Sequence, residues 1–438
     1  MKKRLTAAII CAAMLLAGCS SGSSSSQSRT SAETVEASEI SSETESSETE
    51  TAEPPSASVS DTFAASVNQF NWKLFSEAAQ YKGSNLFYSP FSISTALAMA
   101  DIAANGDTKA AIEEVLGIDD LTQYCEDLQA FIENYAVKEG REDDAQFICA
   151  NSLWLAEGLT LSGDYEEKVA APLEKYFGAE ILTADFAGNI DKVREEISAW
   201  VKEHTNEMIP DYKSISGPET VADFLNAVYF YGEWQEKFSA QNTFDSDFYG
   251  ASATVSVPMM HSSDIWARCI TVRNDSSELT GIALPYIGGA EMDIFLAPEG
   301  EDIVSAFTEL NSDQLFESLS TVDEQLIRTL QLPKFTMDLT FEDLDNCLIN
   351  IGLGICFSSD ADFSSLSDEL CISSIAHRAR IEVDEEGSRA AAVTEIAMKA
   401  TGMLTEGGID FIVDRPFIYV IRDTGSGTIL FTGLVNDL

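Results

Sequence analysis

Few residues of this 438-residue chain combine the types and the spacing that catalysis requires. Residues 423–426 read Asp-Thr-Gly-Ser, the signature of aspartic proteases, but that chemistry needs two carboxylates sharing a proton, and no second Asp-Thr-Gly occurs. We therefore interpret 423–426 as a polar turn. None of the three histidines stands in a nucleophile–base context: we expect His204 to be solvated and His377 to be hydrogen-bonded in the core, and His261 has no catalytic neighbourhood.

No other catalytic motif is present in the sequence. We find no Gly-x-Ser-x-Gly elbow, P-loop, His-Glu-x-x-His or Gly-x-Gly-x-x-Gly. Six of the eight cysteines lie beyond residue 19 at irregular gaps without a Cys-x-x-Cys, so we interpret most of them as small buried hydrophobes and infer no disulfide pairing. We expect no enzyme, no metal site and no cofactor.

The predicted elements place helices early in the chain and strands late. Apolar residues recur at helical spacing over 66–79, 92–104 and 121–136, the second helix following a Ser-Pro pair. Strand-like segments stand at 145–155, 222–230, 292–296, 330–335, 411–413, 417–422 and 428–434. Because strands and helices do not alternate regularly, we expect one α+β domain over 61–438 with antiparallel or mixed sheets.

Charge and composition narrow the possible partners. Hydrophobic residues make up 45% of the chain, enough for a large core. Acidic residues outnumber basic ones 73 to 26, and a formal charge of −47 repels nucleic-acid phosphate. We therefore expect a globular monomer that binds no nucleic acid.

The N-terminus predicts export. Met-Lys-Lys-Arg precedes an apolar stretch at 5–16, as in a signal peptide, and Leu-Ala-Gly-Cys at 16–19 resembles the bacterial lipobox, in which Cys19 is lipidated. Residues 20–60 are mainly Ser, Thr, Glu and Ala, a composition typical of a solvated tether. We expect a lipoprotein signal peptide at 1–19, a disordered tether at 20–60 and an extracellular domain. We expect the lipid on Cys19 to be the domain's only attachment to the bacterial cell surface. The alternative is that an ordinary signal peptide is cleaved and the domain is secreted.

Seven short segments between 85 and 433 carry the most informative pattern. Residues 85–92 read Asn-Leu-Phe-Tyr-Ser-Pro-Phe-Ser, and residues 224–234 read Phe-Leu-Asn-Ala-Val-Tyr-Phe-Tyr-Gly-Glu-Trp. The others are Trp-Val with Thr-Asn in 200–206, Leu-Pro-Lys-Phe at 332–335, Ala-His through Glu-Glu-Gly in 376–387, Arg-Pro-Phe with Ile-Arg in 415–422, and Thr-Ile-Leu-Phe-Thr-Gly at 428–433. In their order along the chain, these seven segments resemble those of the serpin family across nearly all of 61–438.

The resemblance implies a fold of three β-sheets with about eight or nine helices, and an exposed loop that serves as bait for proteases. Ser89, Ser92, Asn226 and His377 match the family's residues under the opening of the large sheet, and Trp234 matches the tryptophan where the loop first inserts. These side chains could also simply satisfy buried polar groups. The family's loop hinge matches Glu385, Gly387, Ser388, Ala390, Ala391 and Ala392.

Inhibition by this family requires the cut loop to enter the sheet as a strand, whose side chains alternate between two faces. The even positions from 388 to 398 are all small or apolar, whereas the three charges stand at positions 389, 395 and 399. No proline lies between 387 and 401. One face of the strand could therefore enter the core without burying a charge, and we expect a loop that can insert.

In the family the bond that proteases attack lies about fourteen residues beyond the hinge glycine, which gives Thr401-Gly402 here. Met403-Leu404 and Lys399-Ala400 are the second and third candidates. A small Thr401 favours an elastase-like enzyme, and Lys399 leaves a trypsin-like enzyme possible. We therefore expect an inhibitor of serine proteases.

Residues 121–136 contain no Lys or Arg, so we expect no activation by heparin-like polyanions.

The sequence leaves functions other than inhibition open. The rival functions are a non-inhibitory serpin, a solute-binding lipoprotein with a two-lobed α/β domain, and a hydrolase without a recognisable motif.

Overall fold

The computed structural model describes residues 59–80, 85–135, 145–273, 278–310, 315, 324–341, 343–368, 370–375, 377–388 and 408–438. The chain divides into units Met1–Thr51 and Ala52–Leu438, and all of these residues belong to the second unit. The described ranges contain eight α-helices and two hydrogen-bonded sheets. None of the helices there has the length and apolar run that a bilayer-spanning helix needs.

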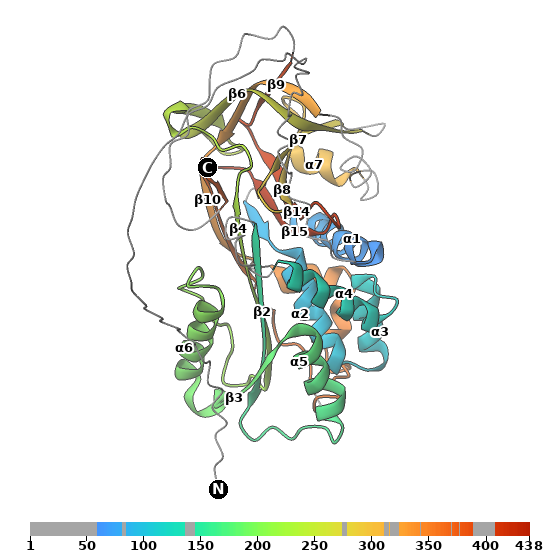
Figure 1. Ribbon diagram of the computed structural model, residues 1–438. Helices are drawn as coiled ribbons and strands as arrows, with labels where there is room; N and C mark the ends of the chain where they lie inside the picture. The colour runs from blue at the N-terminus through green and yellow to red at the C-terminus, as the bar shows by residue number, and fades with distance from the viewer. Residues whose placement is uncertain are drawn as a thin grey trace, which may run out of the picture. The chain divides into compact units, whose positions relative to one another are not determined.

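The six-stranded sheet positions the candidate site. Its order is β10 (Phe335–Thr340), β11 (Arg378–Val383), β12 (Gly387–Ser388), β4 (Ala222–Glu233), β2 (Gln146–Ala156) and β3 (Glu180–Ala184). Strands β2 and β4 pair in antiparallel register over ten residues, from Gln146↔Tyr231 to Leu155↔Ala222. These long strands form the middle of the sheet (Figure 1).

The nine-stranded sheet holds most of the remaining strands. Along its main path lie β1 (Leu86–Tyr88), β15 (Ile429–Val435), β14 (Phe417–Asp423), β8 (Ala290–Leu296), β7 (Glu278–Pro285), β6 (Thr254–Arg273), β9 (Glu324–Pro333) and β13 (Ile409–Ile412), and β5 (Thr243–Tyr249) also pairs with β6. The first half of β6 pairs with β5, its last residues pair with β7, and β9 spans the stretch between. The resemblance implied three sheets, whereas the described strands form two, because β6 pairs with β5, β7 and β9 and so joins them in one sheet.

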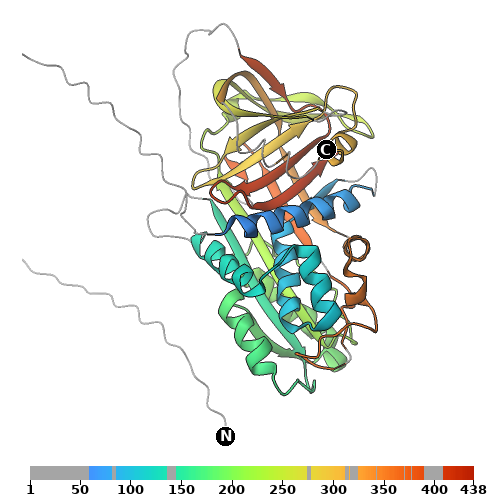
Figure 2. The same cartoon turned by 90° about the vertical axis from the view of Figure 1, so that its right-hand side faces the viewer.

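Helices cover both faces of the six-stranded sheet. On one side lie α1 (Asp61–Ala78), α2 (Pro90–Ala103), α3 (Gly106–Leu116), α4 (Leu121–Asn134) and α5 (Ala171–Phe177), and on the other side lies α6 (Phe186–His204) (Figures 1 and 2). The short helices α7 (Ile303–Thr308) and α9 (Leu344–Asn350), the π-helix Glu166–Ala170, and the 3-10 helices Ala240–Asn242 and Leu353–Phe357 complete the described set.

The side chains of β4 divide between two hydrophobic clusters. Val228 and Phe230 belong to the main core with the helices α1–α5, whereas Leu225 and Ala227 belong to a second cluster under α6. This alternation follows from the two-residue repeat of a strand. Even-numbered positions of β4 therefore point into the main core.

The helices and strands predicted from the sequence are present in the structure, with two differences. Residues 330–335 were expected to form one strand, but β9 ends at Pro333 and β10 begins at Phe335. Proline has no N–H for a continued ladder, and the N–H of Lys334 bonds instead to the carbonyl of Pro258 at 2.9 Å. Strands β3, β5, β6 and β7 were not predicted.

Candidate functional site: the loop hinge and the sheet opening

Two residues of the predicted loop hinge, Gly387 and Ser388, lie inside the six-stranded sheet. Strand β12 runs antiparallel to both neighbours, with Ser388 opposite Val383 of β11 and Gly232 of β4, and Gly387 opposite Glu233. Within the described residues no ladder joins β4 and β11 directly. The position between these two strands is therefore where the loop begins.

Glycine at position 387 has a steric cause. A Cβ atom there would lie 2.0 Å from the carbonyl oxygen of Gly232, closer than any side chain allows. Gly232 has the same requirement from the other side, because its Cβ would lie 2.8 Å from the ring of Tyr286. These two glycines thus let β12, β4 and an aromatic ring pack tightly together.

Ser388 is fully buried and held by a tyrosine. Its hydroxyl lies 2.6 Å from the hydroxyl of Tyr286, whose ring stacks on Trp234 with centroids 4.4 Å apart and planes inclined by 10°. Burial raises the pKa of Tyr286, so both hydroxyl groups are neutral. The side chain of Ser388 therefore marks the core-facing side of β12.

Trp234 fastens the turn that precedes the loop. Its indole Nε1 donates a hydrogen bond to the carbonyl of Asp384 at 2.9 Å, and its backbone N–H donates to the carbonyl of Glu386 at 2.9 Å. The N–H of Phe238 donates to the carbonyl of Glu385 at 3.0 Å. Three backbone carbonyls of the turn are thereby held from the segment that follows β4.

Two lysines pair with the carboxylates of the same turn. Lys334 Nζ lies 2.5 Å from Glu385, which also accepts a hydrogen bond from Thr243 at 2.7 Å. Burial acts to raise the pKa of Glu385, but the bonds from Lys334 and Thr243 outweigh it and hold that pKa below its ordinary value. Lys237 bridges Glu386 at 2.9 Å and Glu233 of β4 at 2.6 Å. Ion pairs thus fix the carboxylates of both Glu385 and Glu386.

A separate polar cluster lies beside the middle of β4. Ser89 caps α2 by accepting the N–H of Ser92 at 3.0 Å, and its own hydroxyl donates to the carbonyl of Leu430 at 2.6 Å. The N–H of Ser89 donates to His377 Nε2 at 2.9 Å. Burial lowers the pKa of His377 to about 4, so its imidazole is neutral and this nitrogen can accept.

Asn226 connects this cluster to the neighbouring strand. The hydroxyl of Ser92 donates to Asn226 Oδ1, and Asn226 Nδ2 donates to Asn151 Oδ1 of β2 at 2.6 Å. Asn151 in turn donates to the carbonyl of Phe177 at 2.8 Å. Helix α2, strands β4 and β2, and the end of α5 are therefore joined through amide and hydroxyl groups.

The five predicted sheet-opening residues thus fall into two groups. Ser89, Ser92, Asn226 and His377 belong to one connected set of contacts, whereas Trp234 stands eight residues along the chain from Asn226, roughly 26 Å in an extended strand. The structure brings Trp234 together with the hinge instead.

Comparisons with known proteins decide the family. The sequence profile described as Serpin (serine protease inhibitor) matches residues 65–438. The chain is a serpin. It is 31% identical over 376 residues to Iripin-2 of Ixodes ricinus, covering 85% of this chain and 92% of that protein. It is 32% identical over 375 residues to an uncharacterized serpin-like protein of Thermococcus kodakarensis, covering 84% of each.

A solved structure agrees with this assignment. The native state of tengpin, a thermophilic serpin, superposes with a TM-score of 0.75 at 27% identity, covering 87% of this chain and 95% of that one. The expected serpin fold is therefore confirmed. The solute-binding alternative is wrong, because it predicted a two-lobed α/β domain, whose architecture differs from the serpin fold.

Several residues of the serpin fall outside the described ranges. They include the proposed lipidation site Cys19, the hinge residues Ala390, Ala391 and Ala392, and the three candidate bonds at 399–404. The register of β12 is the described feature closest to the three hinge alanines. Tyr286, Lys237 and Asn151 were not identified from the sequence, because none of them lies in one of the seven quoted segments. Lys334 lies in the segment 332–335, but its pairing with Glu385 was not predicted either.

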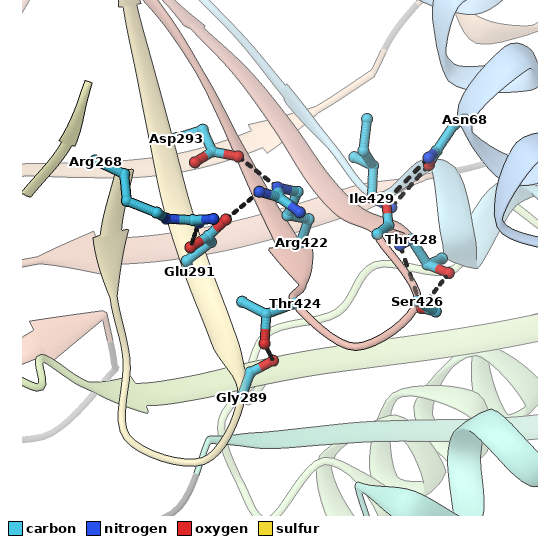
Figure 3. Close-up of polar contacts among 11 residues, drawn as sticks. Asn68, Arg268, Gly289, Glu291, Asp293, Arg422, Thr424, Ser426, Thr428 and Ile429 are labelled. Atoms are coloured by element: carbon cyan, nitrogen blue, oxygen red, sulfur yellow. Dashed lines mark hydrogen bonds and ion pairs between the residues drawn. The ribbon is translucent and has the colours of Figure 1, made fainter. Parts of the chain in front are cut away.

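The Asp-Thr-Gly-Ser segment is a turn of the serpin, as expected. It joins β14 to β15: Thr424 donates to the carbonyl of Gly289 at 2.9 Å (Figure 3). Ser426 donates to Asp423 within the turn. Behind the turn, Arg422 pairs with Glu291 and with Asp293 at 2.6 Å. Burial raises the pKa of Asp293 to about 7 despite Arg422.

His204 was expected to be solvated, but its side chain is only partly exposed. Its ring stacks on Trp200 with centroids 4.3 Å apart, and its two nitrogens lie 2.8 Å from the carbonyl of Trp200 and 3.0 Å from Glu180. This histidine is partly buried because the last turn of α6 places it between the helix and β3. The polar sequence of α6 concealed that contact.

Proposed function

We propose that this serpin inhibits serine proteases by trapping them as an acyl-enzyme while its cut loop inserts between β4 and β11. The observation that carries the proposal is β12: two hinge residues already occupy the ladder between these strands, with Ser388 buried on the core side. A loop that continues from Ser388 as a strand would enter the same space. The small or apolar residues at the even positions that follow Ser388 in the sequence support insertion of the loop.

The register of β12 gives the expected contacts of the inserted strand. Counting back along β4 from Gly232 and along β11 from Val383, position 390 would fall between Phe230 and Ile381, and position 392 between Val228 and Ala379. All four neighbours are buried. Alanine at both positions suits that side of the sheet, since it buries apolar surface and no charge.

The chemistry belongs to the protease, and the serpin supplies the substrate. The protease serine Oγ would form an ester with the carbonyl carbon of Thr401, the C–N bond to Gly402 would break, and the proton would pass to the leaving amine. Insertion would then carry the bound enzyme along the sheet and distort its oxyanion hole before water hydrolyses the ester. Met403-Leu404 and Lys399-Ala400 remain the alternative bonds.

We further propose an elastase-like target and a lipid anchor at Cys19. A small β-branched Thr401 suits a shallow specificity pocket. The signal, the lipobox and the tether support an exported bacterial lipoprotein that works outside the cell, as a monomer.

A panel of elastase-, chymotrypsin- and trypsin-like enzymes tests the proposal. We expect an SDS-resistant complex with an elastase-like enzyme and a released fragment that begins at Gly402 by mass spectrometry. A fragment that begins at Leu404 would move the bond. Trapping of trypsin alone would contradict the elastase preference, and cleavage without any complex would contradict inhibition.

A non-inhibitory carrier is the second candidate. A solved structure of thyroxine-binding globulin in complex with thyroxine superposes on the chain with a TM-score of 0.72 at 25% identity, so this fold also accommodates ligand binding in that protein. A carrier has no need for small residues on one face of the loop. The trapping assay separates the two functions.

A further inference from the structure

A cluster of four charged side chains is built into the nine-stranded sheet. Glu291 and Asp293 stand two residues apart on β8, so they project from the same face of the sheet, and both are buried. Arg422 of β14 pairs with both carboxylates, and Arg268 of β6 pairs with Glu291 (Figure 3). Charges at this depth are tolerated only when each of them has a partner.

The two carboxylates are not equally well paired. Glu291 meets Arg422 with one oxygen and Arg268 with the other. Asp293 accepts the Nε–H of Arg422 on Oδ2 at 2.6 Å, whereas no described residue donates a hydrogen bond to its Oδ1. An ionised carboxylate can accept on both oxygens, so a charge on Asp293 is the less compensated of the two. Of the two acids, Asp293 is therefore the one that holds a proton.

The described elements packed around Asp293 bring no further charge to it. In the register of the sheet it lies between Ala283 of β7 and Val420 of β14. Helix α7 packs on the same face through a contact between Phe307 and Phe295, and its six residues are all uncharged. Within the described residues, the charged groups that face Asp293 are Arg422, Glu291 and Arg268.

The cluster is also connected to the turn at 423–427. Asp423 follows Arg422 on the opposite face of β14, where it accepts hydrogen bonds from Tyr135 at 2.7 Å and from Ser426. Thr424 donates to the carbonyl of the residue at 289, directly before β8 (Figure 3). Turn and cluster thus join β8 to β14 at the same end, and a change in the cluster alters how firmly the two strands pair.

We propose that Asp293 is a proton-controlled clamp between β8 and β14: when protonated it lies neutral beside Arg422, which then serves Glu291, and when ionised it leaves an uncompensated buried charge that loosens the two strands. The clamp does not depend on the proposed inhibitory function. It makes the stability of the nine-stranded sheet respond to the pH of the medium.

The sign follows from burial. Burial raises the pKa of Asp293 to about 7, whereas an aspartate in the unfolded chain loses its proton near pH 4. The folded chain therefore holds one extra proton between these values. The stabilisation by the clamp is complete below about pH 4 and is lost as the pH rises to about 7, which is opposite to the trend expected for His377 with its lowered pKa.

Melting curves of the full-length chain between pH 4.5 and 7.5 test the clamp. Asp293→Asn keeps the shape of the side chain and removes its titration. Relative to this variant, the melting temperature of the wild type should fall by roughly 4 °C across the range. Asp245→Asn is the matched control, because Asp245 is exposed on β5, and it should follow the wild type. Parallel curves for wild type and Asp293→Asn would overturn the proposal.

Hydrogen exchange of the wild type locates the effect without any variant. Between pH 5 and pH 7.5, protection factors corrected for the intrinsic pH dependence of exchange should fall about tenfold more in 289–296 and 417–424 than in β2 and β4. Equal changes in the two sheets would contradict a clamp in the nine-stranded sheet.

Glu291→Gln separates the clamp from the simple loss of an ion pair. It should lower the melting temperature at every pH, because Arg268 and Arg422 both lose a charged partner. Arg422 would then serve Asp293 alone, which favours the ionised form, so the pH dependence should shrink. If Glu291→Gln kept the full pH dependence of the wild type, the two carboxylates would not compete for Arg422, and the proposal would be wrong.

Discussion

Replacing Ala392 by glutamate should convert the inhibitor into a substrate, whereas replacing Ala391 should do much less. In the register of β12, position 392 lies between Val228 and Ala379, which are both buried. Position 391 lies between Tyr229, which is partly exposed, and Arg380, which is exposed. The two variants add the same carboxylate one residue apart, so they differ only in the face that receives it.

The size of the effect follows from the cost of neutralising the carboxylate. On the core side an unpaired glutamate would enter protonated, and taking up a proton at pH 7.5 from an ordinary pKa of about 4.3 costs ~4 kcal/mol. If the insertion barrier carries this whole cost, insertion slows by about a thousandfold. Hydrolysis of the acyl-enzyme keeps its rate, and most of the serpin is cleaved without trapping enzyme.

The assay is the stoichiometry of inhibition with the yield of SDS-resistant complex, measured at pH 7.5 and at pH 5.5. The cost at position 392 falls by about 1.4 kcal/mol per pH unit, so Ala392→Glu should recover part of its complex at the lower pH. Ala391→Glu, with a side chain in solvent, should show no such recovery. Equal complex yields from both variants at pH 7.5 would refute the parity argument, provided that both uncut variants melt at the wild-type temperature.

The remaining predictions concern stability. Gly387→Ala should lower the melting temperature and the complex yield, because its Cβ would meet the carbonyl of Gly232, whereas Gly217→Ala, with open space around its Cβ, should not; calorimetry decides. His377 has its pKa lowered to about 4, so the unfolded chain takes up its proton first as pH falls. Its contribution is present above pH 6.5 and lost by about pH 4, ~3 kcal/mol in urea titrations, and His377→Gln should remove that slope. Cleavage of the loop by a non-target protease should raise the melting temperature sharply, because the inserted strand adds ladder bonds; an unchanged melting curve would contradict insertion.

The serpin fold was predictable because its signal is spread over seven ordered segments rather than one motif. Two of those segments, 85–92 and 224–234, contain the cap of α2 and the centre of β4, and they meet through Ser92 and Asn226. Short apolar runs also located most of β2, β14 and β15, and the last two strands are buried at every residue. This signal failed for β5 and β6, where the burial of successive residues is irregular because both faces change neighbours along the strand.

The contacts of the hinge were not predictable from the same sequence. Tyr286 reaches Ser388 from a turn after β7, and Lys334 reaches Glu385 from the break between β9 and β10. Each pair joins positions more than fifty residues apart. Neither the isolated Tyr286 nor Lys334 within Leu-Pro-Lys-Phe has a pattern that points to its partner. Only the packing of the two sheets brings these side chains together.

The two ends of the loop are held by different parts of the molecule, which makes their functions separable. Trp234, Tyr286 and Lys334 hold the N-terminal end at residues 384–388, in the six-stranded sheet. The C-terminal end is held at Gly408 and Asp410 by β9, in the nine-stranded sheet. Substitutions just beyond Ser388 should therefore change how many captured enzymes remain trapped, while substitutions at Asp410 should leave that number unchanged. An Asp410→Asn variant that altered the stoichiometry of inhibition would show that the two ends are coupled, contrary to this division.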